Sequence, residues 1–180
     1  MTAWVIAATV AVVLTAHEVA GAQGVGAKAL PASSSGIVLV DSTGKVVARP
    51  LNDTVMLIAL GSGVAAPASI RAIYDADGKT ASGLATWQSG GSVLFTSSDC
   101  TTGPHVYGAS IAGVRAAAQV QTPAGVTLYV GAVGAASTVA IQSILYDSGC
   151  APVTVRQNGL HPVVTNVNLT ATYPPPLSFQ

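Results

Sequence analysis

Residues 36–49 read GIVLVDSTGKVVAR, and this stretch indicates how the chain folds. Two short apolar runs, 37–40 and 46–49, flank a turn that begins at Asp41 and contains Gly44. An Asp side chain accepts hydrogen bonds from the backbone of a type I turn, and Gly takes the left-handed position that follows. The pattern therefore predicts a β-hairpin with a bulge at the glycine.

The same signal occurs a second time, where VDSTGK at residues 40–45 is matched by YDADGK at residues 74–79. A solenoid needs at least three repeats, so two occurrences indicate a recurring hairpin. Similar apolar runs, separated by turn residues, continue to about residue 172. Their spacing predicts an all-β domain over residues 36–173, an antiparallel β-sandwich or irregular barrel of short strands.

The expected strands are short and rich in Val, Ile, Leu, Thr and Tyr. Residues 115–119 contain helix formers, but the turn at residues 122–125 follows at once, which favours strand, turn and strand. Three prolines at 174–176 favour polyproline II, so residues 174–180 are predicted to form a Pro-rich tail outside the sheet. The expected strands are 37–40, 46–49, 55–60, 69–74, 81–88, 92–96, 105–107, 114–121, 126–130, 138–146, 153–157 and 163–172.

The start of the chain is typical of a targeting segment. An uncharged apolar run at residues 4–16 is followed by the small residues Ala20, Gly21 and Ala22, as in a secretory signal peptide of residues 1–22. The run is too short for a membrane span. No Lys or Arg precedes it, so an uncleaved anchor is the alternative. Cleavage predicts a secreted, periplasmic or cell-surface protein with no membrane span and a flexible arm at residues 23–35.

The chain has two cysteines, Cys100 and Cys150. In an exported chain an even number of cysteines indicates a disulfide, and two cysteines allow one intramolecular pairing. Both lie beside turn residues, where burial as free thiols is not expected. The sequence therefore predicts a Cys100–Cys150 bridge that stabilises the folded state by about 3–4 kcal/mol on the chain-entropy model.

The composition is poor in charge. Only 8% of residues are charged, the formal net charge is zero and the sequence pI is about 6.8. A nucleic-acid-binding surface is basic, so this class of partner is not expected. Low charge weakens the repulsion between molecules, which predicts a possible homo-oligomer; a general bias toward small residues is the other interpretation.

Two motifs contain aspartates that could carry chemistry. Asp147-Ser148-Gly149 is similar to the catalytic turn of aspartic proteases, but too few residues follow it to build the rest of such an enzyme. Asp75 and Asp77 begin like a calcium loop, but no carboxylate follows at the end of such a loop. Both motifs are interpreted as hairpin turns.

Other candidate groups form no recognised set. His105 and His161, with Asp99 or Cys100, lack the spacing of a metal site. Residues 108–113 fail the Gly-x-Ser-x-Gly pattern of hydrolases, and no dinucleotide or phosphate loop is present. The sequence therefore predicts no catalytic, cofactor-binding or metal-binding residues and no cofactor. N-glycosylation patterns occur at residues 52–54 and 168–170.

The segment FTSSDCTTG at residues 95–103 resembles a recurrent segment of uncharacterised secreted bacterial proteins, in which an aromatic residue precedes Ser, Asp-Cys and Gly and a second Cys lies near the domain end. This resemblance implies an exported β domain with one bridge and implies no activity. A fainter similarity is to chaperone–usher pilins, which are also exported, low in charge and end with an aromatic residue next to the last position, as Phe179 does here.

The expected function is a structural or binding role at the cell envelope or outside the cell, with an envelope protein or a second copy as partner. The first alternative is a pilin-like or fibre-forming subunit, which would assemble through sheet edges. The second is a secreted hydrolase with an Asp-based site, and Asp147, Asp75 and Asp77 would then be its candidate groups.

Overall fold

The computed structural model describes residues 36–61, 63–111 and 113–180. The predicted signal peptide at 1–22 and the predicted arm at 23–35 lie outside the described residues. The described chain consists almost entirely of antiparallel strands with one short helix, which confirms the all-β prediction. None of the helices in this part of the chain is long and apolar enough to cross a membrane.

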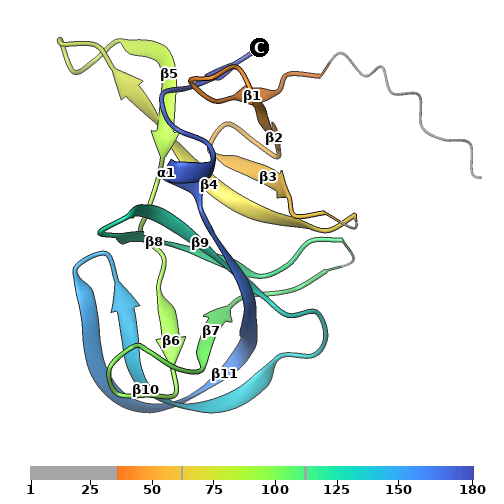
Figure 1. Ribbon diagram of the computed structural model, residues 1–180, viewed down its shortest axis with the longest axis vertical. Coiled ribbons are helices and arrows are strands. Elements are labelled where there is room, and N and C mark those ends of the chain that lie inside the picture. The colour runs from red at the N-terminus through yellow and green to blue at the C-terminus, as the bar shows by residue number, and fades with distance from the viewer. Residues whose placement is uncertain (1–35, 62, 112) are drawn as a thin grey trace, which may run out of the picture. The chain divides into compact units, whose positions relative to one another are not determined.

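Five strands from the first half of the described chain and one strand from its C-terminal end form a closed antiparallel barrel (Figure 1). The strand order around the barrel is β1-β12-β5-β4-β3-β2. Its interior is filled by large apolar side chains that are almost completely buried, including Met56, Ile58 and Trp87. The barrel strands are β1 (Leu39–Val40), β2 (Val46–Pro50), β3 (Val55–Ala59), β4 (Ala65–Tyr74), β5 (Ala81–Trp87) and β12 (Leu177–Phe179).

Strand β12 corrects the prediction that residues 174–180 form a tail outside the sheet. It lies between β1 and β5, with Leu39 opposite Phe179 and Leu177 opposite Ala85. The side chain of Leu177 is fully buried in the barrel core. The prolines precede this strand, so its own backbone N–H groups are available for pairing. Burial of the apolar Leu177 side chain stabilises the closed barrel.

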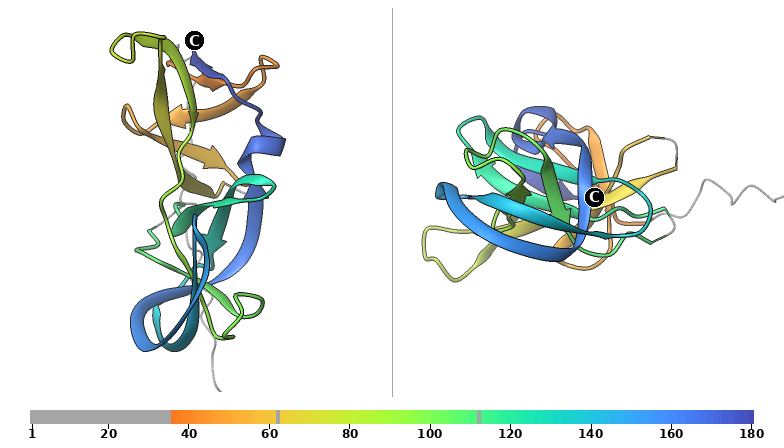
Figure 2. Two further views of the ribbon diagram at one scale, coloured as in Figure 1. Left: turned by 90° about the vertical axis from the view of Figure 1, so that its left-hand side faces the viewer. Right: turned by 90° about the horizontal axis from the view of Figure 1, so that it is seen from below.

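The second half of the domain forms another antiparallel sheet with the order β10-β6-β7-β11-β9-β8. Strand β10 also pairs with β11, so β10, β6, β7 and β11 form a closed circuit of strand pairs. Figure 2 shows β11 as a long curved ribbon. The strands are β6 (Val93–Phe95), β7 (Pro104–Tyr107), β8 (Ala117–Thr122), β9 (Gly125–Gly131), β10 (Ser137–Tyr146) and β11 (Gly149–Asn168).

Two strand predictions in this half have different outcomes. Strands β8 and β9 form a hairpin across residues 123–124, which confirms strand, turn and strand there. The predicted strand at 163–172 is too long, because β11 ends at Asn168 and helix α1 (Leu169–Thr172) follows. The Asn168 side chain accepts a hydrogen bond from the backbone N–H of Ala171 at 2.9 Å, so it caps this helical turn.

Strand β9 joins the two halves because both of its faces are covered. Val126, Leu128 and Val130 pack into the barrel cluster, whereas Tyr129 packs against the cluster of the second sheet. Alternating side chains of one strand point to opposite faces, so a single strand can serve two cores. The barrel and the second sheet are therefore packed on a shared strand.

The Cys100–Cys150 disulfide is present, as predicted, with a Cα–Cα distance of 5.9 Å. It joins the loop between β6 and β7 to the beginning of β11. The buried Ser143 supports the same loop, because its hydroxyl donates to the carbonyl of Ser97 at 2.6 Å and accepts from the N–H of Cys100 at 3.0 Å. Covalent and hydrogen-bonded contacts thus fix this loop against β10 and β11.

Candidate functional site

A cavity of about 470 Å³ lies where the barrel meets the second sheet, and we call it the linker pocket. Residues 88–92, which connect β5 to β6, form one wall. Val55, Pro67 and Ser69 of β3 and β4 line it from the barrel, and Tyr107 of β7 and residues 117–119 of β8 line it from the second sheet.

The frame of the linker pocket is held by hydrogen bonds around Gln119. This buried side chain accepts from the backbone N–H of Ser69 and donates to the Ser69 carbonyl at 3.2 Å. The Gln119 carbonyl accepts from the N–H of Gly91 at 2.8 Å. A Cβ atom at residue 91 would lie 2.8 Å from that carbonyl oxygen, so the close approach requires glycine. Hydrogen bonds therefore connect the barrel, the linker and β8 around the pocket.

Four neutral polar residues that line the linker pocket have exposed or half-buried side chains. Ser89 and Ser92 are half-buried, Gln88 is exposed, and Tyr107 is 63% exposed. None of the hydrogen bonds formed among the described residues uses these four side chains. The pocket combines hydroxyl and amide groups with one aromatic ring, which suits a ligand that both donates and accepts hydrogen bonds.

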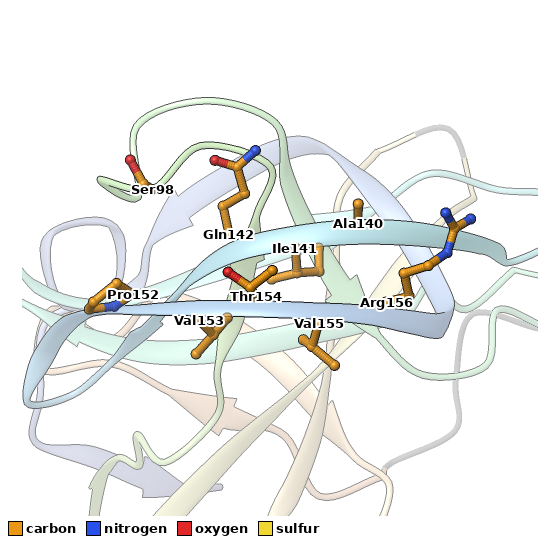
Figure 3. A pocket seen from close by; sticks show the side chains of 9 residues that line it. All are labelled: Ser98, Ala140, Ile141, Gln142, Pro152, Val153, Thr154, Val155 and Arg156. Atoms are coloured by element: carbon orange, nitrogen blue, oxygen red, sulfur yellow. The ribbon is translucent and has the colours of Figure 1, made fainter.

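A second hollow is an open groove of about 620 Å³ along the hairpin of β10 and β11, which we call the hairpin groove. Figure 3 shows Gln142 and Arg156 on one side of the hairpin and Val153 and Val155 on the other. Ile141 lies in the groove and is almost completely buried. An open groove with one cation is suited to contact with another surface.

Asp147 lies in the exposed turn between β10 and β11, outside both hollows. Its Oδ1 accepts a hydrogen bond from the backbone N–H of Gln121 at 2.7 Å, at the outer edge of β8. The carboxylate of the Asp-Ser-Gly motif thus caps a strand edge. This geometry fits the interpretation of the motif as a hairpin turn.

The two repeated hairpins form as predicted, with Gly44 at φ +83° and Gly78 at φ +67°. The capping aspartate differs between them. Asp41 accepts from the N–H groups of Thr43 and Lys45, whereas in the second turn Asp77 accepts from those of Lys79 and Thr80. Hydrogen bonds from the Thr80 hydroxyl and backbone lower the pKa of Asp77 to about 2.

Asp41 is the more enclosed of these two turn aspartates. Its side chain is buried, and its Oδ2 has no hydrogen-bond partner among the described residues. The hydrogen bond from the Thr43 hydroxyl to Oδ1 is the largest cause that holds the pKa of Asp41 below its usual value. The Asp41 carboxylate is therefore ionised near neutral pH, and it accepts the hydrogen bonds that hold the turn.

His105 lies in a strand, as the expected strand at 105–107 predicts, and His161 also lies in a strand although Pro162 follows it. His161 is buried in β11 and pairs with Val106, and His105 in β7 pairs with Pro162. His105 Nδ1 is 2.8 Å from the Gly103 carbonyl. Pairing with neighbouring strands therefore overrides the local effect of the prolines.

The other two candidate metal ligands serve the loop between β6 and β7. Asp99 accepts from the hydroxyl of Thr101 at 2.6 Å, which lowers its pKa, and Cys100 is in the disulfide. Within the described ranges no group of three His, Cys, Asp or Glu residues could hold a metal ion.

The two glycosylation patterns differ in structure. The Asn168 amide donates to the Ala124 carbonyl at 2.9 Å while its oxygen caps α1, so both ends of the side chain are occupied. The Asn52 oxygen accepts from the N–H groups of Thr54 and Val55 in an exposed turn. Of these two asparagines, only Asn52 has a side-chain amide nitrogen without a hydrogen bond among the described residues.

Comparisons with known proteins give no match to a family model, to a curated protein or to a solved structure.

The sequence did not predict the linker pocket, because residues 88–92 indicate only a turn. The run Gln-Ser-Gly-Gly-Ser is a weak signal, because such residues are typical of any connection between strands.

Proposed function

We propose that this protein is an exported, non-enzymatic binding module that acts at the cell envelope or outside the cell. The observation that carries the proposal is the linker pocket, in which neutral donors and acceptors face a cavity whose frame is braced by Gln119. A preformed cavity with a few convergent polar groups is the usual form of a small-molecule site.

Four of the six aspartates in the described residues are engaged in hydrogen bonds, which favours binding over hydrolysis. Asp41, Asp77 and Asp99 accept hydrogen bonds in their own turns, and Asp147 caps β8. Hydrogen bonds lower the pKa values of Asp41, Asp77 and Asp99, which makes these groups poor general acids or bases near neutral pH. A hydrolase with an Asp-based site therefore gains little support.

The sheet edges favour a binding module over a fibre subunit. The barrel is closed, and β10 pairs with β11, so β8 is the edge strand among the described strands. Two of its outward groups are engaged, because the Gln119 carbonyl accepts from Gly91 and the Gln121 N–H donates to Asp147. Assembly by strand addition needs a free edge of this kind.

The disulfide supports an extracytoplasmic location, because such bridges persist in oxidising compartments. A direct test fuses alkaline phosphatase, which folds only after export, behind residue 180 and compares the full chain with a variant lacking residues 1–22. We expect phosphatase activity only with the leader. Equal activity of both fusions would contradict export by this segment.

Binding is tested with the exported protein purified from the host. Light scattering on size-exclusion fractions over a hundredfold concentration range is expected to give a constant monomer mass. Sedimentation with washed envelope preparations, with serum albumin as the reference, is expected to carry the protein into the pellet. A mass that grows with concentration, without envelope binding, would favour the fibre-subunit alternative.

A further inference from the structure

We propose that the linker pocket binds a neutral carbohydrate, with Tyr107 as the stacking residue. This inference rests on the proposed binding function and names its ligand class. The residues that line the pocket include Ser89, Ser92, Tyr107 and Gln88, whose side chains carry three hydroxyls and one amide. A sugar offers hydroxyls that donate and accept, together with C–H faces that pack on an aromatic ring, and it matches this set of groups.

The charges around the cavities select a neutral ligand. Among the described residues, no charged side chain lines the linker pocket. The hairpin groove, in contrast, is lined by Arg156. Of two further hollows, one is lined by Asp53 and Arg71 and the other by Arg115. A phosphate, a carboxylate or an ammonium group in the linker pocket would find no opposite charge, so its desolvation would be uncompensated.

The hydrogen bonds of the frame disfavour an extended peptide. A peptide bound by strand addition needs free backbone groups on the sheet edge. Here the Gln119 carbonyl is occupied by Gly91, and both backbone groups of Ser69 are occupied by the Gln119 side chain. The groups that remain free are side-chain hydroxyls and an amide, which recognise the hydroxyls of the ligand.

The ring of Tyr107 is held in place by Gly159 of β11. A Cβ atom on residue 159 would lie 2.8 Å from Cε2 of Tyr107, so the ring packs directly on the glycine backbone. Gly159 has φ +76°, a conformation that favours glycine for a second reason. Gly159 is therefore a positioning residue for Tyr107, which lines the pocket and is 63% exposed.

Isothermal titration of the exported protein with neutral hexasaccharides tests the proposal. The probes are β-1,4-glucan, β-1,3-glucan, α-1,4-glucan, mannan and chitin hexamers, with a hexagalacturonate as the anionic comparison. We expect at least one neutral hexamer to bind and the anionic one not to bind. Binding of hexagalacturonate alone, or of none of the probes, overturns the proposal.

Variants then assign the site. Tyr107→Ala is expected to weaken binding about 10-fold or more, which is at the lower end of the loss found when an aromatic ring that stacks on a nucleic-acid base is removed. Tyr107→Phe keeps the ring and is expected to stay within about threefold of the parent. The matched control is Tyr74→Ala, because Tyr74 is 57% exposed on β4 and lies outside the pocket. Equal losses in the Tyr107→Ala and Tyr74→Ala variants would overturn the assignment.

The positioning role of Gly159 has its own readout. Gly159→Ala is expected to weaken binding and to shift the ring resonances of Tyr107 in NMR spectra, with the far-ultraviolet circular dichroism unchanged. If this variant does not fold, the Tyr107 variants decide the proposal alone. Failure with all carbohydrates while envelope sedimentation persists rejects the carbohydrate and leaves the binding function standing; failure of both rejects both.

Discussion

The barrel and the second sheet are held together in different ways. The barrel buries one continuous cluster of large side chains, among them Met56, Ile70 and Trp87, and closes through strands that are distant in sequence. The second sheet divides its core into two clusters, with five and three buried residues, and carries the disulfide. Small cores supply little stabilisation, so the disulfide, which restricts the unfolded chain, supplements the smaller clusters of the second sheet.

The largest effect that separates the two regions is expected from Trp87→Ala. Trp87 is 3% exposed, and its indole N–H donates to the Tyr173 carbonyl at 2.9 Å. Loss of such a side chain lowers the free energy of unfolding by about 3–5 kcal/mol. Urea unfolding followed by circular dichroism measures it. A loss below about 1 kcal/mol would show that the barrel core does not depend on this residue.

The next effect concerns the bridge. A variant with Cys100→Ser and Cys150→Ser is expected to lose about 3–4 kcal/mol of unfolding free energy, because the open chain gains conformational freedom. Amide hydrogen exchange should accelerate in β10 and β11 more than in β3 and β4, since Cys150 begins β11. Equal acceleration in both regions would mean that the bridge stabilises the domain as one unit.

A smaller effect is expected at the edge of β8. Asp147→Ala removes the acceptor of the Gln121 N–H, and loss of one such hydrogen bond costs about 1 kcal/mol. The exposed edge should also associate, so light scattering is expected to detect dimers at high concentration. Asp147→Asn keeps an acceptor oxygen and serves as the matched control. Dimers in both variants would point to lost charge as the cause.

The smallest effect is a dependence on acid. The folded-state pKa of Asp77 is lowered to about 2 and that of Asp99 is lowered as well, so each contributes stability above its unfolded pKa. This contribution is lost as the pH falls from about 4 toward 2. Urea midpoints measured across that range should fall less steeply with decreasing pH in the Asp77→Asn variant than in the parent protein. Asp99→Asn serves as the comparison variant. An unchanged slope in both variants would contradict these roles.

Local chemistry made part of the fold predictable. The turns at Asp41 and Asp77 follow from the preferences of aspartate and glycine, and the bridge follows from having only two cysteines in a chain predicted to be exported. Strand β12 was missed because the prolines suggested a break, whereas burial of Leu177 decides the outcome. Tertiary contacts override local preference at such a position.

The candidate site could not be predicted for the same reason. Ser69, Tyr107 and Gln119 lie far apart in the sequence, and only the packing of the barrel on β8 and β9 brings them to one cavity. No motif marks them individually. The contact between Gly159 and Tyr107 likewise depends on β11 pairing with β7.

The position of β12 between β1 and β5 has a consequence for the order of folding. A polypeptide is synthesised from its N-terminus, so β1 and β5 exist long before the strand that must lie between them. Until Leu177 arrives, the barrel interior is open to water and both neighbouring edges are unpaired. A polypeptide that ends before residue 177 therefore cannot close the barrel, and it presents an open, protease-sensitive sheet.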